Sequence, residues 1–265
     1  MIPTALHLSD AEISALLGTF LWPLFRVMGL LIADPLFGTR SIPRKFKVGM
    51  AIVITVLITP SLPPMPAVAV ISGTGLLMIA QQLIIGMALG FIMRMTITVV
   101  EMAGFLISTQ MGLGFAMLFD PQHNSQVPTI SRLLSLMVFM MLLAMDGHHL
   151  ILSTLIDSFR LFPISPEFLP RIGFRQLADW GSKMFSLGLL LSMPVVGALL
   201  IINLAIGVMT RAAPQFNIFS FGFPLTLLAG FIALYLSLPS FADGIIQLYR
   251  EGTAMMLTLL KARAG

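Results

Sequence analysis

The sequence predicts an all-α, polytopic membrane protein built from long, kinked helices and helical hairpins. Its 265 residues are 57% hydrophobic and only 10% charged, with a mean hydropathy of +0.99, whereas about 25% of the residues in a soluble domain are charged. The apolar residues form continuous runs without the alternation of barrel strands, and lipid admits only helices or closed barrels. This composition excludes a soluble enzyme, a disordered scaffold and a nucleic-acid-binding domain.

Charge-free apolar stretches mark the expected helices. Two of them, 184–209 and 218–242, exceed the roughly 20 residues that cross the hydrocarbon core. A third, 71–93, is long enough, and a fourth, 102–119, is near the lower limit. Three further stretches are short or interrupted by proline or arginine, and we expect protein rather than lipid to shield them: 13–33, 48–59 and 133–145.

The distribution of charge and proline predicts an orientation and a division of the chain. The segment Gly38–Lys47 carries four basic residues and no acid. The positive-inside rule places this segment in the cytoplasm and the N-terminus on the other side. The segment 162–175 contains three prolines and is expected to be an irregular connection between two halves.

The sequence offers no set of residues for catalysis or for holding a metal or cofactor. Cysteine is absent, which excludes thiol chemistry and disulfides. The metalloprotease, nucleophile-elbow and P-loop motifs are absent too. His148 and His149 are adjacent, and neighbouring residues of a helix point about 100° apart, so the pair does not easily chelate one ion. We therefore expect no enzyme, no metal and no cofactor.

Three charged residues lie within or beside apolar stretches: Arg26, Arg94 and Glu101. Each would cost about 2.5–3.5 kcal/mol if it faced lipid at the centre of the bilayer. Arg94 and Glu101 are seven residues apart, so they share nearly the same face of a helix. A proton or ion relay is one interpretation. We favour the other, in which these side chains lie at helix ends or against another subunit.

A glycine-rich segment between Gln110 and Pro121 predicts a break in the helix. Gly112 and Gly114 each destabilise a regular helix by roughly 1 kcal/mol. Bulky apolar side chains then follow at Phe115, Met117 and Phe119. A compact apolar loop of this kind is tolerated at membrane depth when it is buried or lines a cavity, and it could block ions by dewetting. An ordinary glycine-kinked helix end remains the alternative.

The segment from Asn203 to Pro224 predicts a tight hairpin between the two longest apolar stretches. Asn203, Gly207 and Arg211 follow at intervals of four and therefore share one helix face. Pro214 ends that helix, and Gly222 with Phe223 and Pro224 begins the next one. The polar residues of the turn, which can bond the freed backbone groups, are Gln215 and Asn217.

This hairpin carries a long pattern that resembles the FliR family of the flagellar type III export apparatus. The pattern consists of Asn203, Gly207, Arg211, Pro214, Gln215, Asn217, Phe219, Gly222, Phe223 and Pro224. Three further stretches are similar to the family: Arg40–Gly49, Gln81–Gly86 and Gln110–Pro121. The virulence-type (injectisome) secretion systems have a homologous subunit, and the third stretch is more similar to the flagellar branch.

The resemblance implies a structural subunit of a helical export gate that conducts unfolded flagellar proteins across the bacterial inner membrane at the basal body. The implied partners are FliP, FliQ, FlhB, exported flagellar proteins in transit and membrane lipid, with no nucleic acid. Residues 1–182 would form a FliP-like part and 183–265 a FliQ-like hairpin with the C-terminal tail. A pore-plugging loop would map to about 106–120. Partner subunits would supply much of the burial of the charges at Arg26, Arg94 and Glu101.

A second hypothesis is an autonomous secondary transporter. Its midplane site would use Gln81, Gln82, Arg94 and Glu101. Transporters of this class are typically built from inverted repeats with broken helices, and the sequence shows no such repetition.

Overall fold

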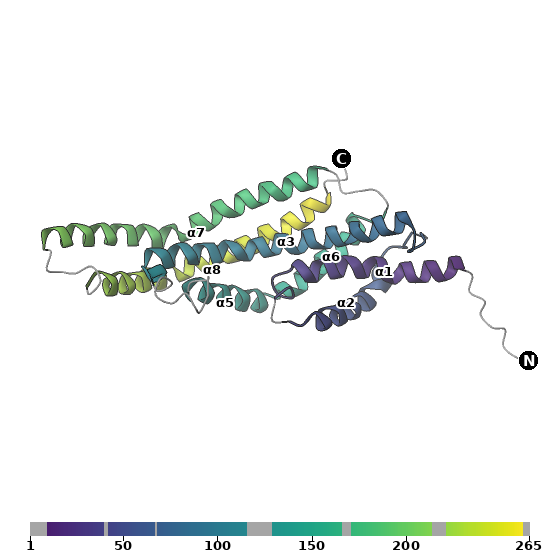
Figure 1. Ribbon diagram of the computed structural model, residues 1–265, viewed down its shortest axis with the longest axis horizontal. Helices are drawn as coiled ribbons and strands as arrows, with labels where there is room; N and C mark the ends of the chain where they lie inside the picture. Colours follow the sequence, from purple (N-terminus) through teal and green to yellow (C-terminus); the bar gives the residue numbers. More distant parts are fainter. Residues whose placement is uncertain are drawn as a thin grey trace, which may run out of the picture. The chain divides into compact units, whose positions relative to one another are not determined.

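The computed structural model describes residues 10–39, 42–66, 68–115, 129–165, 171–213 and 221–261, and these residues contain helices and no β-strand. The predicted all-α fold class is therefore confirmed (Figure 1). The helices are α1 (Asp10–Ala33), α2 (Arg44–Ile58), α3 (Gly73–Gln110), α5 (Thr129–Ala144), α6 (Gly147–Leu161), α7 (Arg171–Ala212) and α8 (Phe223–Lys261), with short 3-10 turns η1 (Thr59–Ser61) and η2 (Leu113–Phe115).

Within the described residues, three helices are long and apolar enough to cross a membrane, namely α3, α7 and α8. The number rises to four if the broken pair α5 and α6 counts as one span. The chain is thus a multi-pass membrane protein. The most apolar window of α3 is 61% buried within the chain, whereas those of α7 and α8 are each only 22% buried. The two C-terminal helices therefore leave most of their apolar surface uncovered by the chain itself.

Helix α3 corrects the expectation of two separate stretches at 71–93 and 102–119. It runs without interruption over 38 residues from Gly73 to Gln110. Arg94 and Glu101 had suggested a boundary, but both are good helix formers, so charge alone does not end the backbone hydrogen-bond ladder. The irregular connection expected over 162–175 ends earlier in the structure, because α7 begins at Arg171.

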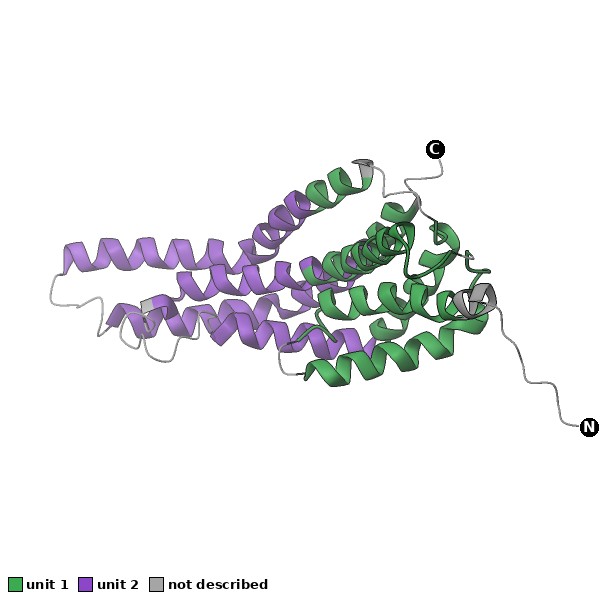
Figure 2. Cartoon of the chain, turned by 45° about the vertical axis from the view of Figure 1, so that its right-hand side comes forward, with its two compact units in different colours: residues 1–94, 146–180, 252–265 green, residues 95–145, 181–251 purple. Residues whose placement is uncertain are grey.

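The chain divides into two compact units, and α3, α7 and α8 contribute residues to both (Figure 2). Unit 1 consists of residues 1–94, 146–180 and 252–265, and unit 2 of residues 95–145 and 181–251. Each unit is held together by helices that approach one another at small residues.

In unit 1, α1 lies against α3 at glycines. A Cβ at Gly90 would lie 2.7 Å from the carbonyl oxygen of Leu30, and one at Gly86 would overlap the carbonyl oxygen of Arg26. A Cβ at Gly29 of α1 would likewise lie 2.5 Å from the carbonyl oxygen of Leu83. Small residues allow this backbone-to-backbone approach, which is the usual basis of helix packing in membranes.

In unit 2, α7 and α8 form an antiparallel hairpin, as the sequence predicts. Lys183 Nζ lies 2.9 Å from Glu251 Oε2, and a Cβ at Gly244 would lie 2.9 Å from Leu191 Cδ1. Residue numbers along α7 increase as those of the contacting residues of α8 decrease, so the two helices run in opposite directions. Helix α5 packs on α3 at Gly104, where an added Cβ would lie 2.5 Å from Ser131 Cα.

Gly86→Ala should destabilise unit 1, because the added methyl group has no space against the backbone of α1. Overpacking of this kind costs about 1–3 kcal/mol. Gly49→Ala is the matched control, since a Cβ there meets nothing within 4 Å, and alanine is the better helix former. The thermal midpoint of the helical circular dichroism signal in detergent measures both variants. Equal midpoints would contradict the close approach of α1 and α3.

Candidate functional site

A buried polar cluster of unit 1 is built around Arg26 of α1, which is fully buried. Its Nε donates to Gln82 Oε1 of α3 at 2.8 Å. Its Nη1 donates to the carbonyl oxygen of Ser158 at 2.8 Å and to Ser158 Oγ at 3.2 Å, and its Nη2 donates to the carbonyl oxygen of Phe162 at 3.0 Å. The guanidinium carbon also lies 4.2 Å from the ring centroid of Phe159. One side chain thereby connects α1, α3 and the C-terminal end of α6.

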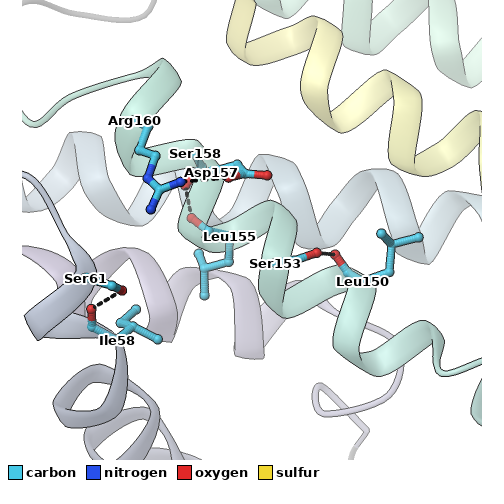
Figure 3. A network of polar contacts seen from close by, with 8 residues as sticks. All are labelled: Ile58, Ser61, Leu150, Ser153, Leu155, Asp157, Ser158 and Arg160. Atoms are coloured by element: carbon cyan, nitrogen blue, oxygen red, sulfur yellow. Dashed lines mark hydrogen bonds and ion pairs between the residues drawn. The ribbon is translucent and has the colours of Figure 1, made fainter.

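Local bonding in α6 explains why Ser158 can accept from Arg26 (Figure 3). The Ser158 hydroxyl donates to the carbonyl oxygen of Leu155 at 2.6 Å, so its lone pairs are available to an external donor. Ser153 makes the same kind of bond to Leu150 at 2.9 Å on an exposed part of the helix. Serine hydroxyls in helices commonly bond back to the preceding turn.

Arg26 corrects part of the charge interpretation. We had expected partner subunits to supply much of its burial, but unit 1 buries it completely. Its acceptors are two carbonyl oxygens, an amide oxygen and a hydroxyl, all of them neutral. A guanidinium held on every side by neutral acceptors and a ring face is a structural tie between helices, and it is poorly suited to passing protons.

Asp34 follows the end of α1 and is also fully buried. Its Oδ1 accepts hydrogen bonds from the backbone N–H groups of Leu36 at 2.8 Å and Phe37 at 3.1 Å. Burial raises the pKa of this carboxyl to about 6, against the opposing effect of those two backbone donors. The hydrogen bonds that this carboxylate accepts from Leu36 and Phe37 stabilise the turn that follows α1.

Glu101 and Arg94, the other two charged residues, are less buried than Arg26. Glu101 is half-buried in unit 2, where its Oε1 accepts from Ser135 Oγ at 3.3 Å and its carbonyl oxygen accepts from Ser131 Oγ at 2.7 Å. Arg94 is exposed on the chain by itself. Contact of these two residues with other subunits remains a prediction.

The end of α3 is the beginning of the predicted pore loop. The helix continues to Gln110, so the loop starts at Met111 rather than near residue 106, because the first residue that favours a break is Gly112. Gly112 has a φ of 79°, in the left-handed region where glycine commonly ends helices. Its N–H donates to the carbonyl oxygen of Thr109 at 3.1 Å. A Cβ at Gly114 would meet nothing within 4 Å, so steric crowding does not require glycine there.

The structure connects this helix end to the hairpin through Asn203 of α7. Asn203 Nδ2 donates to the carbonyl oxygen of Gln110 at 3.3 Å and to Gln110 Oε1 at 3.4 Å. The next residue, Met111, is fully buried, and a Cβ at Gly230 of α8 would lie 2.5 Å from Met111 Cγ. Asn203 and Gly230 thus hold the root of the predicted pore loop against both helices of the hairpin. Gly230 gave no signal in the sequence, because an isolated glycine inside an apolar run has no motif around it.

Five other residues of the hairpin pattern lie in the part of the chain that the structure describes: Gly207, Arg211, Gly222, Phe223 and Pro224. Gly207 and Arg211 are exposed. Helix α7 ends at Ala212, and α8 begins at Phe223 with Pro224 in its first turn, both as predicted. Gly222 is buried. Several predicted site residues lie outside the described residues: Met117, Phe119, Pro214, Gln215, Asn217, Phe219 and the side chain of Phe115.

The hairpin of unit 2 carries a large exposed apolar surface, which we call the hairpin face. Its members are more than half exposed although all are large and apolar, and such surfaces usually mark contact with another protein or with a membrane. They are Phe185, Leu190, Met193, Leu200, Ile201, Leu204 and Val208 on α7, and Leu228, Phe231, Ile232, Tyr235 and Leu236 on α8.

The fold and these surfaces define a class: an all-α, multi-pass membrane protein with an exposed apolar hairpin face. Residues 17–252 match the family model "Bacterial export proteins, family 1". The chain therefore belongs to this family of bacterial export proteins.

Individual relatives carry the name "Flagellar biosynthetic protein FliR". The chain is 39% identical to the protein of Escherichia coli (strain K12), over 89% of this chain and 90% of that protein. It is 36% identical to the protein of Pectobacterium carotovorum, over 91% and 92%, and 32% identical to that of Bacillus subtilis (strain 168), over 81% and 84%. The resemblance drawn from the sequence patterns is confirmed, and the chain is a component of the flagellar export apparatus.

Arg26→Ala should strongly destabilise unit 1, because it removes four buried hydrogen bonds, to Gln82, Ser158 and Phe162. Loss of a buried charged donor costs at least about 3 kcal/mol. Arg160→Ala is the control, since Arg160 is exposed and its pairing with Asp157 at 3.9 Å is expected to contribute about 0–1 kcal/mol. Thermal midpoints in detergent and the yield of folded protein measure both. Similar midpoints for the two variants would show that the Arg26 tie is not needed.

Asn203→Ala should loosen the last turn of α3. Loss of the amide donor removes about 0.5–1.5 kcal/mol, so hydrogen–deuterium exchange at the amides of Met111 and Gly112 should quicken by up to roughly tenfold. Gly197→Ala, on the same helix and with open space around it, should leave that exchange unchanged. Identical exchange in the Asn203 variant and the wild type would contradict the anchoring role.

Proposed function

We propose that the chain is a non-enzymatic, channel-forming subunit of the flagellar type III export gate. It would form part of the wall of a conduit through which unfolded flagellar proteins cross the bacterial inner membrane at the basal body. Membership of the export family supports a role in the flagellar export apparatus. The hairpin face is the observation that supports the role of a wall.

The exposed apolar residues of α7 in the hairpin face run from Phe185 to Val208, which is about 35 Å of helix at 1.5 Å per residue. The hydrocarbon core is about 30 Å thick, and a moderate tilt lengthens the apolar path across it. Length alone is therefore compatible with cover by lipid, and we propose that a neighbouring subunit covers part of the hairpin face.

We propose FliP and FliQ as the neighbours in a hetero-oligomeric gate, with FlhB joining it. In this proposal residues 1–182 correspond to a FliP-like part and 183–265 to a FliQ-like hairpin. The antiparallel pairing of α7 with α8, fixed near Lys183 and Glu251, supports a hairpin over the second of these ranges. Arg94, which is exposed on the chain by itself, is proposed to lie against a neighbour.

We propose that the loop beginning at Met111 closes the resting pore to ions. Two features of its root support this. Gly112 ends α3 abruptly, and Asn203 together with Gly230 ties the helix end to the hairpin, so a loop at this point starts from a fixed position. The residues proposed to form the plug are Gly112, Gly114, Phe115, Met117 and Phe119.

The alternatives receive less support. The names of the relatives favour the flagellar apparatus over the injectisome branch. A secondary transporter would need free polar groups for its substrate, but Gln82 accepts from Arg26 and the Glu101 carboxylate accepts from Ser135. Those two side chains already have structural roles.

Deletion of Gly112–Phe119 should make assembled export complexes leak ions at rest, because the proposed plug is removed. Replacing Phe115, Met117 and Phe119 with serine keeps the length of the loop and should also raise the leak. Ile71→Ser, in a fully exposed connection of unit 1, should leave it at the wild-type level. The readout is ion flux through complexes in sealed membranes. Wild-type permeability in both plug variants would refute the plug assignment.

A further inference from the structure

Outside the hairpin, a cluster of potential metal ligands lies at the start of α6. Asp146, His148 and His149 each offer one ligand atom, and these atoms all lie within 4.8 Å of one another. His149 Nδ1 lies 3.5 Å from Asp146 Oδ1, and the two imidazole centroids are 4.1 Å apart. Two imidazoles and one carboxylate are a common ligand set for divalent transition metals.

The backbone at Asp146 explains how three residues so close in sequence can gather their side chains. Asp146 has a φ of 55°, in the left-handed region that residues other than glycine rarely adopt. Its carbonyl oxygen accepts from the N–H groups of His149 at 2.9 Å and Leu150 at 3.3 Å. Its carboxylate makes no capping bond to the helix, so it remains beside the imidazoles. Adjacent residues of a helix point about 100° apart, but the two imidazole rings converge here, with their centroids 4.1 Å apart.

His148 supplies an independent indication. Its Nδ1 is buried and has no hydrogen-bond partner within the part of the chain that the structure describes. Buried polar nitrogens in proteins nearly always have a partner. The ring is only partly exposed, whereas Asp146 and His149 are exposed.

We propose that Asp146, His148 and His149 form a binding site for a divalent transition-metal ion of the zinc type. Zinc binds nitrogen and oxygen ligands at about 2.0–2.2 Å in tetrahedral geometry, so two ligand atoms on one ion lie about 3.4 Å apart. His149 Nδ1 and Asp146 Oδ1, which are 3.5 Å apart, already have this spacing. The other separations in the cluster, all within 4.8 Å, reach it by rotation of the side chains. Three protein ligands leave a coordination position for water. Calcium and magnesium are disfavoured because they prefer oxygen ligands.

Bound metal would stabilise the first turn of α6. The positive end of the helix dipole opposes a cation at this place, and the Asp146 carboxylate offsets that repulsion. The site is therefore one of moderate affinity whose effect is structural. This proposal is independent of the pore and of the hairpin face.

The test uses the full-length chain in detergent, purified with an affinity tag that contains no histidine and stripped with a chelator. Zinc is titrated in competition with a chromophoric chelator. We expect one zinc ion per chain, and at least about tenfold weaker binding in His148→Ala, His149→Ala and Asp146→Asn. A variant with His7 and His123, the two other histidines, changed to alanine should bind as the wild type does.

Cobalt substitution supplies a second readout that does not depend on affinity. A nitrogen- and oxygen-ligated cobalt ion should give visible absorption bands that are lost in His149→Ala, while the helical circular dichroism signal is retained. If a histidine variant does not fold, Asp146→Asn, which is nearly isosteric and lies on an exposed turn, decides the result. Wild-type zinc affinity in His148→Ala and His149→Ala, or binding that is lost only in the His7 and His123 variant, would overturn the proposal.

Discussion

The apolar surface of α7 and α8 exceeds what this chain can cover, and most features of the molecule follow from that constraint. Helix α7 has 42 residues and α8 has 39, so each is longer than a bilayer requires. Their most apolar windows are only 22% buried within the chain. Exposed apolar surface of this kind marks contact with a membrane or with another protein, and we propose that neighbouring subunits cover part of it.

In each unit, a buried or half-buried polar side chain fixes helices to one another. Arg26 holds three helices in unit 1 with neutral acceptors, and Asn203 holds the end of α3 in unit 2. An apolar interior offers little orientation of its own, because apolar contacts are not directional. Hydrogen bonds supply that direction, and the bond of Asn203 to Gln110 places the beginning of the loop at Met111 at a defined point on the hairpin.

The sequence predicts local features well and distant contacts poorly. The helix start at Phe223 and Pro224, the end of α7 before Pro214 and the break at Gly112 all follow from residues with strong backbone preferences. The continuity of α3 does not follow from the apolar pattern, because Arg94 and Glu101 interrupt the apolar runs without interrupting the helix. The partners of Arg26 lie 56 to 136 residues away in the chain, and the contact of Asn203 with Gln110 spans 93 residues. No local pattern encodes such pairs, and Gly230 becomes meaningful only beside Met111.

The most direct test of the account is photo-crosslinking from the hairpin face in cells that assemble the flagellar export apparatus. A benzophenone amino acid at Leu204 or Tyr235, which are 70% and 72% exposed, should yield adducts with other export subunits. The same probe at the buried Leu199 should yield none. If Leu204 and Tyr235 instead give only lipid adducts, the hairpin face is covered by the bilayer, and the chain is not a wall element completed by neighbours.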